Sequence, residues 1–115
     1  QLRIFLISIM EKKKKHFCYC LHLYPGYYEK SGWTEMDIET VGLHFRYLQD
    51  YLEKGILFLA GRTVNEPMSE KDFGIVILEV DDKEEAKSIM DNDPAVKGNI
   101  MYAELFEFSL ALLRS

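Results

Sequence analysis

The chain has 115 residues, of which 48% are hydrophobic and 13% aromatic, and these values fit one domain with a substantial core. Its formal net charge of −5 argues against nucleic-acid binding, because that function needs a basic surface to displace counterions from phosphates. No apolar run approaches the roughly 20 residues that span a bilayer, so we expect no membrane partner.

The first residues differ in character from the rest of the chain. Residues 1–9 are mostly apolar and precede Met10, Glu11 and the lysine run from Lys12 to Lys15. A secretory signal carries its basic region before the apolar stretch, whereas here the basic run follows it, so we do not expect these residues to be such a signal. We interpret residues 1–9 as a leader, added artificially or by upstream translation, and residues 10–115 as a single domain. The alternative is an added edge strand or a swapped arm.

Two predicted elements make up the first half of the domain. Residues 16–24 alternate like a strand, with Phe17 and Tyr19 on one face, and Pro25-Gly26 ends the strand. A loop follows to residue 33. Thr34 and Asp37 have capping-box spacing, and Gly55 suits the position after a helix end, so we expect a helix over 35–54. Its predicted apolar stripe consists of Val41, Phe45, Leu48 and Leu52.

The second half predicts two strands, a helix and a last strand. Residues 56–60 and 73–80 are apolar runs separated by a polar loop. Asp82 can cap a helix over 83–92, and Pro94 prevents its continuation. Residues 100–108 form the last predicted strand. The order β-α-β-β-α-β is that of a ferredoxin-like α+β sandwich.

The strand at 73–80 is apolar on both of its faces. Ile75 and Ile77 lie on one face, while Val76, Leu78 and Val80 lie on the other. The two helices of one chain cannot cover both faces of the sheet. A second copy of the same sheet is the simplest cover, so we expect a homodimer.

Short motifs in this order resemble those of the YCII-related family over roughly residues 16–108. The motifs are His44-Phe45-Arg46-Tyr47-Leu48, Gly55-Ile56-Leu57, Leu59-Ala60-Gly61, Ile77-Leu78-Glu79-Val80, Glu84-Glu85-Ala86 and Asn92-Asp93-Pro94. The resemblance implies a dimeric α+β barrel with a His and an Asp as an active-site pair, which fall on His44 and Asp93. Some relatives are thought to carry out lyase, dehydrohalogenation or isomerisation steps without cofactors. Arg62 stands where the family usually has Pro, so the resemblance does not assign the substrates of other members to this chain.

Each candidate residue also has an ordinary structural interpretation. His44 is a natural proton carrier, but a histidine beside an apolar stripe is often a satisfied core residue. Asp93 would orient His44, or would be a simple turn residue before Pro94. Because the two predicted helices lie side by side in this fold, contact between His44 and Asp93 is feasible.

Three further residues are candidate substrate contacts. Arg62 follows a strand end and can bind a carboxylate bidentately, unless it is an ordinary surface arginine. Tyr24 and Tyr102 would supply an aromatic wall or pack against a second copy.

The residues His16, Cys18, Cys20 and His22 have metal-ligand chemistry, but they spread along one strand, so we expect no metal site. A disulfide between Cys18 and Cys20, two positions apart on that strand, would be strained. We therefore expect free thiols, a reducing compartment and a cytoplasmic location.

The sequence thus predicts a small enzyme without a cofactor, which uses His44 and Asp93 for proton transfer on a small organic molecule in lyase or isomerase chemistry. The alternative is a noncatalytic module on the same dimeric scaffold that binds a small ligand or another protein.

Overall fold

A computed structural model describes residues 14–114 of the chain. The expectations for residues 1–9 lie outside this range. The elements are β1 (Lys15–Leu23), the short 3₁₀ turns η1 (Pro25–Tyr27) and η2 (Lys30–Gly32), α2 (Glu35–Glu53), β2 (Leu57–Arg62), β3 (Gly74–Val80), α3 (Lys83–Asp91), α4 (Pro94–Lys97) and β4 (Met101–Phe108). In the described part of the chain, no helix is long and apolar enough to cross a membrane.

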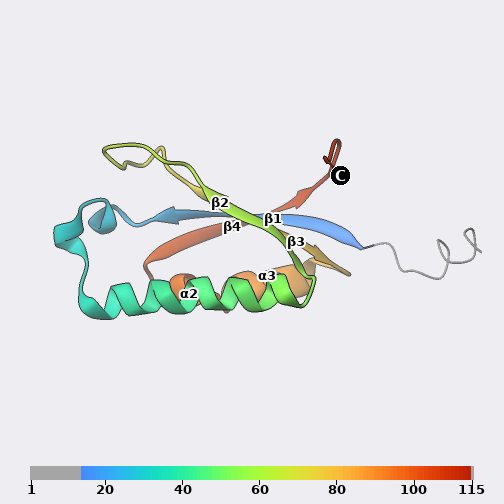
Figure 1. Cartoon of the computed structure of the whole chain (residues 1–115), viewed down its shortest axis with the longest axis horizontal. Helices are drawn as coiled ribbons and strands as arrows, with labels where there is room; N and C mark the ends of the chain where they lie inside the picture. Colours follow the sequence, from blue (N-terminus) through green and yellow to red (C-terminus); the bar gives the residue numbers. More distant parts are fainter. Residues whose placement is uncertain (1–13, 115) are drawn as a thin grey trace, which may run out of the picture.

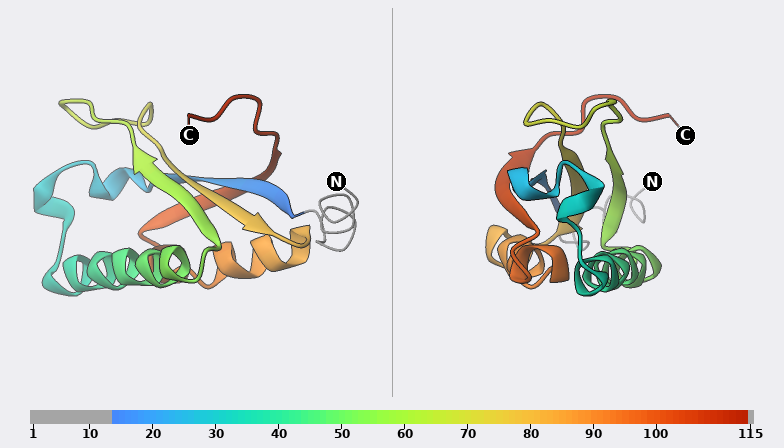
Figure 2. Two further views of the ribbon diagram at one scale, coloured as in Figure 1. Left: turned by 45° about the vertical axis from the view of Figure 1, so that its right-hand side comes forward. Right: turned by 90° about the vertical axis from the view of Figure 1, so that its left-hand side faces the viewer.

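The four strands form one antiparallel sheet in the order β2-β3-β1-β4. The helices lie in a layer on one face of this sheet, and no element of the described chain covers the other face (Figures 1 and 2). This arrangement confirms the predicted ferredoxin-like α+β fold.

Local sequence signals fix the bounds of α2. The Thr34 hydroxyl accepts a hydrogen bond from the backbone N–H of Asp37, and the Asp37 carboxylate accepts one from the backbone N–H of Thr34. This reciprocal box satisfies two N–H groups that the first turn leaves without partners. At the other end, Gly55 has a φ of +75°, a left-handed conformation that ends the helix at little steric cost.

The core lies between the sheet and the helix layer. Phe17, Tyr19, Val76 and Leu78 project from the two central strands and are at most 2% exposed. Ala86, Ile89 and Met90 of α3 pack against them.

The prediction that the apolar stripe of α2 packs into the core was wrong for most of its length. Leu48 is its one buried member, whereas Phe45 is 63% exposed and Leu52 is 54% exposed. The cause is the course of the β2–β3 hairpin, which rises away from α2 after starting near the helix end (Figure 1). Part of the apolar face of α2 therefore lines an open space instead of the core.

The segment after α3 also differs from the prediction. Pro94 does end the preceding helix, but it also opens the one-turn helix α4, for which Asp93 is the N-cap. Proline is well suited to a first helical position, because its fixed φ fits and its missing N–H is not needed there. This short helix positions Asp93.

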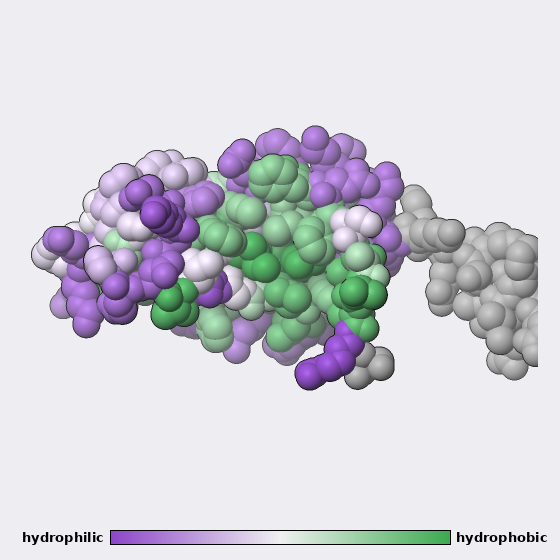
Figure 3. Space-filling model, turned by 90° about the horizontal axis from the view of Figure 1, so that it is seen from above, coloured by the Kyte–Doolittle hydropathy of each residue, from purple (hydrophilic) through white to green (hydrophobic). Residues whose placement is uncertain are grey.

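The open face of the sheet carries apolar side chains across three strands. Cys18 on β1 lies between Ile77 on β3 and Phe106 on β4 in register. Phe106 is 48% exposed and Tyr102, further along β4, is 41% exposed. Seen from the side opposite the helices, hydrophobic residues gather over the middle of the molecule (Figure 3).

Candidate active site

His44 and Asp93 are in direct contact. The Nδ1 atom of His44 lies 2.6 Å from Oδ1 of Asp93, although 49 positions separate the two residues in the chain. The side chain of His44 is 12% exposed and that of Asp93 is fully buried. Because a carboxylate oxygen accepts, Nδ1 of His44 carries the shared hydrogen. The structure therefore brings the predicted pair together, and its chemical role remains a prediction.

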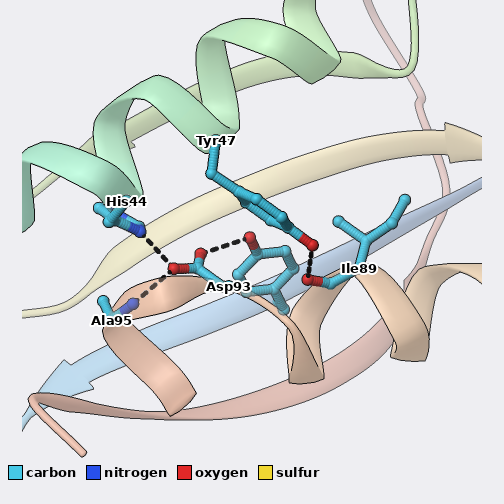
Figure 4. Close-up of polar contacts among 6 residues, drawn as sticks. His44, Tyr47, Ile89, Asp93 and Ala95 are labelled. Carbon is cyan, nitrogen blue, oxygen red and sulfur yellow. Dashed lines mark hydrogen bonds and ion pairs between the residues drawn. The ribbon is translucent and has the colours of Figure 1, made fainter. Parts of the chain in front are cut away.

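The start of α4 holds Asp93 in place. Oδ1 of Asp93 also accepts a hydrogen bond from the backbone N–H of Ala95 at 3.0 Å, as an N-cap does (Figure 4). At the other end of α4, a Cβ on Gly98 would lie 2.9 Å from the Pro94 carbonyl oxygen and 3.1 Å from the Thr40 methyl group of α2. The absence of a side chain at Gly98 thus lets α4 pack closely against the helix that carries His44.

Tyr19 is a third member of this group that the sequence interpretation missed. Its hydroxyl donates to Oδ2 of Asp93 at 2.8 Å, and its side chain lies in the core. Burial, and next the negative charge of Asp93, raise the pKa of Tyr19 well above its ordinary value. The phenol therefore stays a donor, and both oxygens of Asp93 have partners.

The sequence could have predicted that Tyr19 has a hydrogen-bond partner, because it faces the core and a buried tyrosine hydroxyl needs one. The sequence pattern could not identify that partner 74 positions away. Tyr47 of α2 meets the same need differently, since its hydroxyl donates to the carbonyl oxygen of Ile89 at 2.7 Å (Figure 4).

His44 also borders a cleft of about 790 Å³ between α2 and the β2–β3 hairpin. Its other ring nitrogen, Nε2, makes no hydrogen bond within the described residues. Every buried side-chain nitrogen or oxygen in that part of the chain has a partner, so Nε2 is not buried. Asp93 thus lies behind the ring, and the imidazole is the group of the pair that reaches the cleft.

The walls of the cleft are mainly apolar. Besides His44, they include Trp33, Val41, Phe45, Leu48, Leu52, Leu57, Met68, Phe73 and Val76, with Gln49, Arg62, Thr63, Ser69 and Asp72 as polar members. Such a mixture of apolar walls and a few polar groups is typical of sites for small organic molecules.

A hydrogen-bonded network orders the loop that forms one wall. The carboxylate of Asp72 accepts from the Thr63 hydroxyl and the Asn65 amide at 2.8 Å each, and from the Ser69 backbone N–H at 3.0 Å. The bonds from the Ser69 backbone and the Thr63 hydroxyl hold the pKa of Asp72 below its ordinary value. Asp72 therefore acts as the anchor of this loop.

The three predicted substrate contacts do not lie together. Arg62 lines the cleft, and its guanidinium donates to the Thr63 carbonyl oxygen at 3.4 Å. Tyr24 and Tyr102 do not line the cleft. Their rings are 5.1 Å apart, and Tyr102 stacks on His22 on the open face of the sheet. In the single chain these two tyrosines are not brought to His44.

The strand residues with metal-ligand chemistry also remain apart. His16 pairs with Glu79, at 2.9 Å between Nε2 and Oε2, and Cys18 and Cys20 are free thiols. Burial, and next the neighbouring Cys20, raise the pKa of Cys18 to about 11. Among residues 14–114, no three His, Cys, Asp or Glu side chains are grouped so that they could hold a metal ion.

The fold and the site define an α+β protein with a histidine–carboxylate pair beside an apolar cleft. The model of the YCII-related domain matches residues 17–109, so the chain belongs to the YCII-related family. This finding confirms the resemblance read from the motifs.

One similar solved structure is 5-chloro-2-hydroxyhydroquinone dehydrochlorinase (TftG) from Burkholderia phenoliruptrix AC1100, in complex with 2,5-dihydroxybenzoquinone. It has a TM-score of 0.62 and 20% sequence identity over 84% of this chain and 95% of that chain. At this identity the likeness shows the fold alone. No curated protein matches the chain by sequence.

Proposed function

We propose that this protein is a small enzyme that needs no cofactor and transfers a proton to or from a small organic molecule through His44. The observation that carries the proposal is that the two ring nitrogens of His44 have different surroundings. Its Nδ1 is held 2.6 Å from the buried Asp93 carboxylate. The ring borders the cleft, and its Nε2 has no hydrogen-bond partner among the described residues.

The role of each residue follows from ordinary acid–base chemistry. Asp93 holds the hydrogen on Nδ1, so the lone pair of Nε2 points away from Asp93 and is available as a base. When Nε2 takes a proton from a carbon of the ligand, the adjacent carboxylate stabilises the imidazolium. The same proton can then return to another atom of the ligand or assist a leaving group. Tyr19 is a positioning residue, because it acts through Asp93 and lies in the core.

Lyase or isomerase chemistry fits this machinery, since both need one group that accepts and returns a proton. The structural neighbour is named as a dehydrochlorinase and is bound to a small cyclic molecule. Together with the apolar walls of the cleft, this favours a small cyclic compound as the ligand here.

The proposal includes a homodimer formed through the open face of the sheet. Phe106 and Phe108 of β4 are 48% and 37% exposed on that face of the single chain, which also carries Cys18 of β1 and Ile77 of β3. Covering this surface with a second copy removes it from water, and the family resemblance favours the same arrangement. Tyr24 and Tyr102 belong to the same face, so in this proposal they pack against the second copy.

The free thiols of Cys18 and Cys20 fit the proposed reducing, cytoplasmic compartment.

The experiment is a screen of small cyclic compounds, including 5-chloro-2-hydroxyhydroquinone and enolisable cyclic ketones, incubated with the protein in D₂O. Proton NMR reads both product formation and exchange of carbon-bound hydrogen, so proton abstraction is seen even without a complete reaction. We expect His44→Ala to lower any such rate by about 10²- to 10⁴-fold. Glu39→Ala, at an exposed position of the same helix, is the control.

A rate that is equal in wild type and His44→Ala would overturn the proposal. Saturable binding of a panel compound without turnover or exchange would favour the noncatalytic binding module.

A further inference from the structure

We infer that the ligand of the cleft is a small monoanion with an apolar carbon body, and that Arg62 receives its charged oxygen atoms. The inference rests on the proposed function in one respect, because it names the class of molecule that the same cleft takes. It concerns recognition of the ligand, and its test does not require turnover.

Among the described residues that line the cleft, Arg62 is the only lysine or arginine. It is exposed at the end of β2, and within the described residues its guanidinium makes one long hydrogen bond, to the Thr63 carbonyl oxygen at 3.4 Å. Most of its donors are therefore available to a ligand. A guanidinium offers two parallel N–H groups, which match the two oxygens of a carboxylate.

Among the described residues of the cleft wall, Asp72 is the one acidic side chain, and its hydrogen bonds go to its own loop, while the charge of Arg62 makes a smaller contribution to its lowered pKa. Asp72 is 8% exposed, and its oxygens accept three hydrogen bonds from its own loop. Its network includes Thr63, the residue that follows Arg62. The backbone N–H of Thr63 also donates to the carbonyl oxygen of Phe73, the residue before β3, at 2.9 Å. The network therefore fixes the backbone beside Arg62 and leaves the guanidinium as the exposed charge.

The position of Arg62 predicts how the ligand lies. An anionic group is poorly accommodated against the apolar walls formed by residues such as Leu48 and Val76, because burying a charge without a partner is costly. The charged oxygens are expected at Arg62, where water still has access, and the carbon body is expected between α2 and the sheet. A single arginine also favours one negative charge over the two of a phosphate ester.

The test compares two probes of nearly equal shape, 2-naphthoate and its neutral amide 2-naphthamide, by NMR titration of the isotopically labelled full chain. We expect 2-naphthoate to bind about tenfold more tightly, equivalent to about 1.4 kcal/mol. In Arg62→Gln this ratio should fall toward one. Arg46→Gln removes the same charge from an exposed position of α2 outside the cleft, so the ratio should persist there.

Three results would overturn the inference: equal affinities of the two probes for the wild type, a ratio unchanged by Arg62→Gln, or no saturable binding of 2-naphthoate in the millimolar range. None of them bears on proton transfer, which is tested by the His44→Ala rates. A ratio near one together with a rate lost in His44→Ala would refute the anionic ligand and leave the proposed function standing.

Discussion

The hydrogen bond from Tyr19 to Asp93 gives a sharp stability prediction. The Tyr19→Phe substitution keeps the ring in the core and removes one oxygen atom. Oδ2 of Asp93, in a side chain that is fully buried, then loses the donor at 2.8 Å that satisfies it. Leaving a buried polar group without its partner costs about 1–3 kcal/mol, and a carboxylate belongs near the upper end. We therefore expect the free energy of unfolding to fall by about 2–3 kcal/mol.

Tyr47→Phe is the control, because it removes the hydroxyl of a partly buried tyrosine whose acceptor is the neutral carbonyl oxygen of Ile89. Its expected cost is about 0.5–1.5 kcal/mol. Both values come from urea denaturation followed by circular dichroism at one protein concentration, since association would shift the apparent stability. A loss in Tyr19→Phe no larger than that in Tyr47→Phe would refute the reasoning that Tyr19 stabilises a buried carboxylate.

Three further predictions concern α4, the cleft loop and the open face. Gly98→Ala should lower the melting temperature, because its Cβ would lie 2.9 Å from the Pro94 carbonyl oxygen; an unchanged temperature would show that α4 shifts freely. Because hydrogen bonds lower the pKa of Asp72, its carboxylate stabilises the fold above the ordinary aspartate pKa of about 3.9 and loses this effect as pH falls through the lowered pKa. Asp72→Asn should therefore be less stable than wild type near pH 7 in thermal melts, with the gap narrowing below about pH 4; a constant gap would contradict this. Light scattering should give about twice 13.5 kDa for the wild type and a smaller mass for Phe106→Glu, whereas a wild-type monomer would contradict the proposed dimer.

The elements with strong local signals could be predicted from the sequence. The cap at Thr34 and the left-handed Gly55 set the bounds of α2 to within a residue. The alternation in β1 identified its core face, because a strand exposes opposite faces at successive residues. The four-residue helix α4 escaped prediction, since so short a segment has no measurable periodicity.

The long-range features were less predictable. The exposure of Phe45 depends on where the β2–β3 hairpin runs, which no periodicity within α2 reports. Contact between His44 and Asp93 was expected from the family motif and the side-by-side helices. No sequence motif predicted the hydrogen bond from Tyr19 to Asp93. Sequence patterns identify which side chains need partners, and the tertiary fold decides which partners they obtain.

The central claim is that the imidazole of His44 carries the proton in the cleft, and chemical rescue tests it most directly. His44→Ala removes the ring and leaves room for free imidazole beside Asp93. With the panel compound that the wild type turns over or exchanges fastest, we expect a low rate for the variant that rises with added imidazole, while the wild-type rate does not change. A His44→Ala variant that keeps the wild-type rate without imidazole would contradict the account.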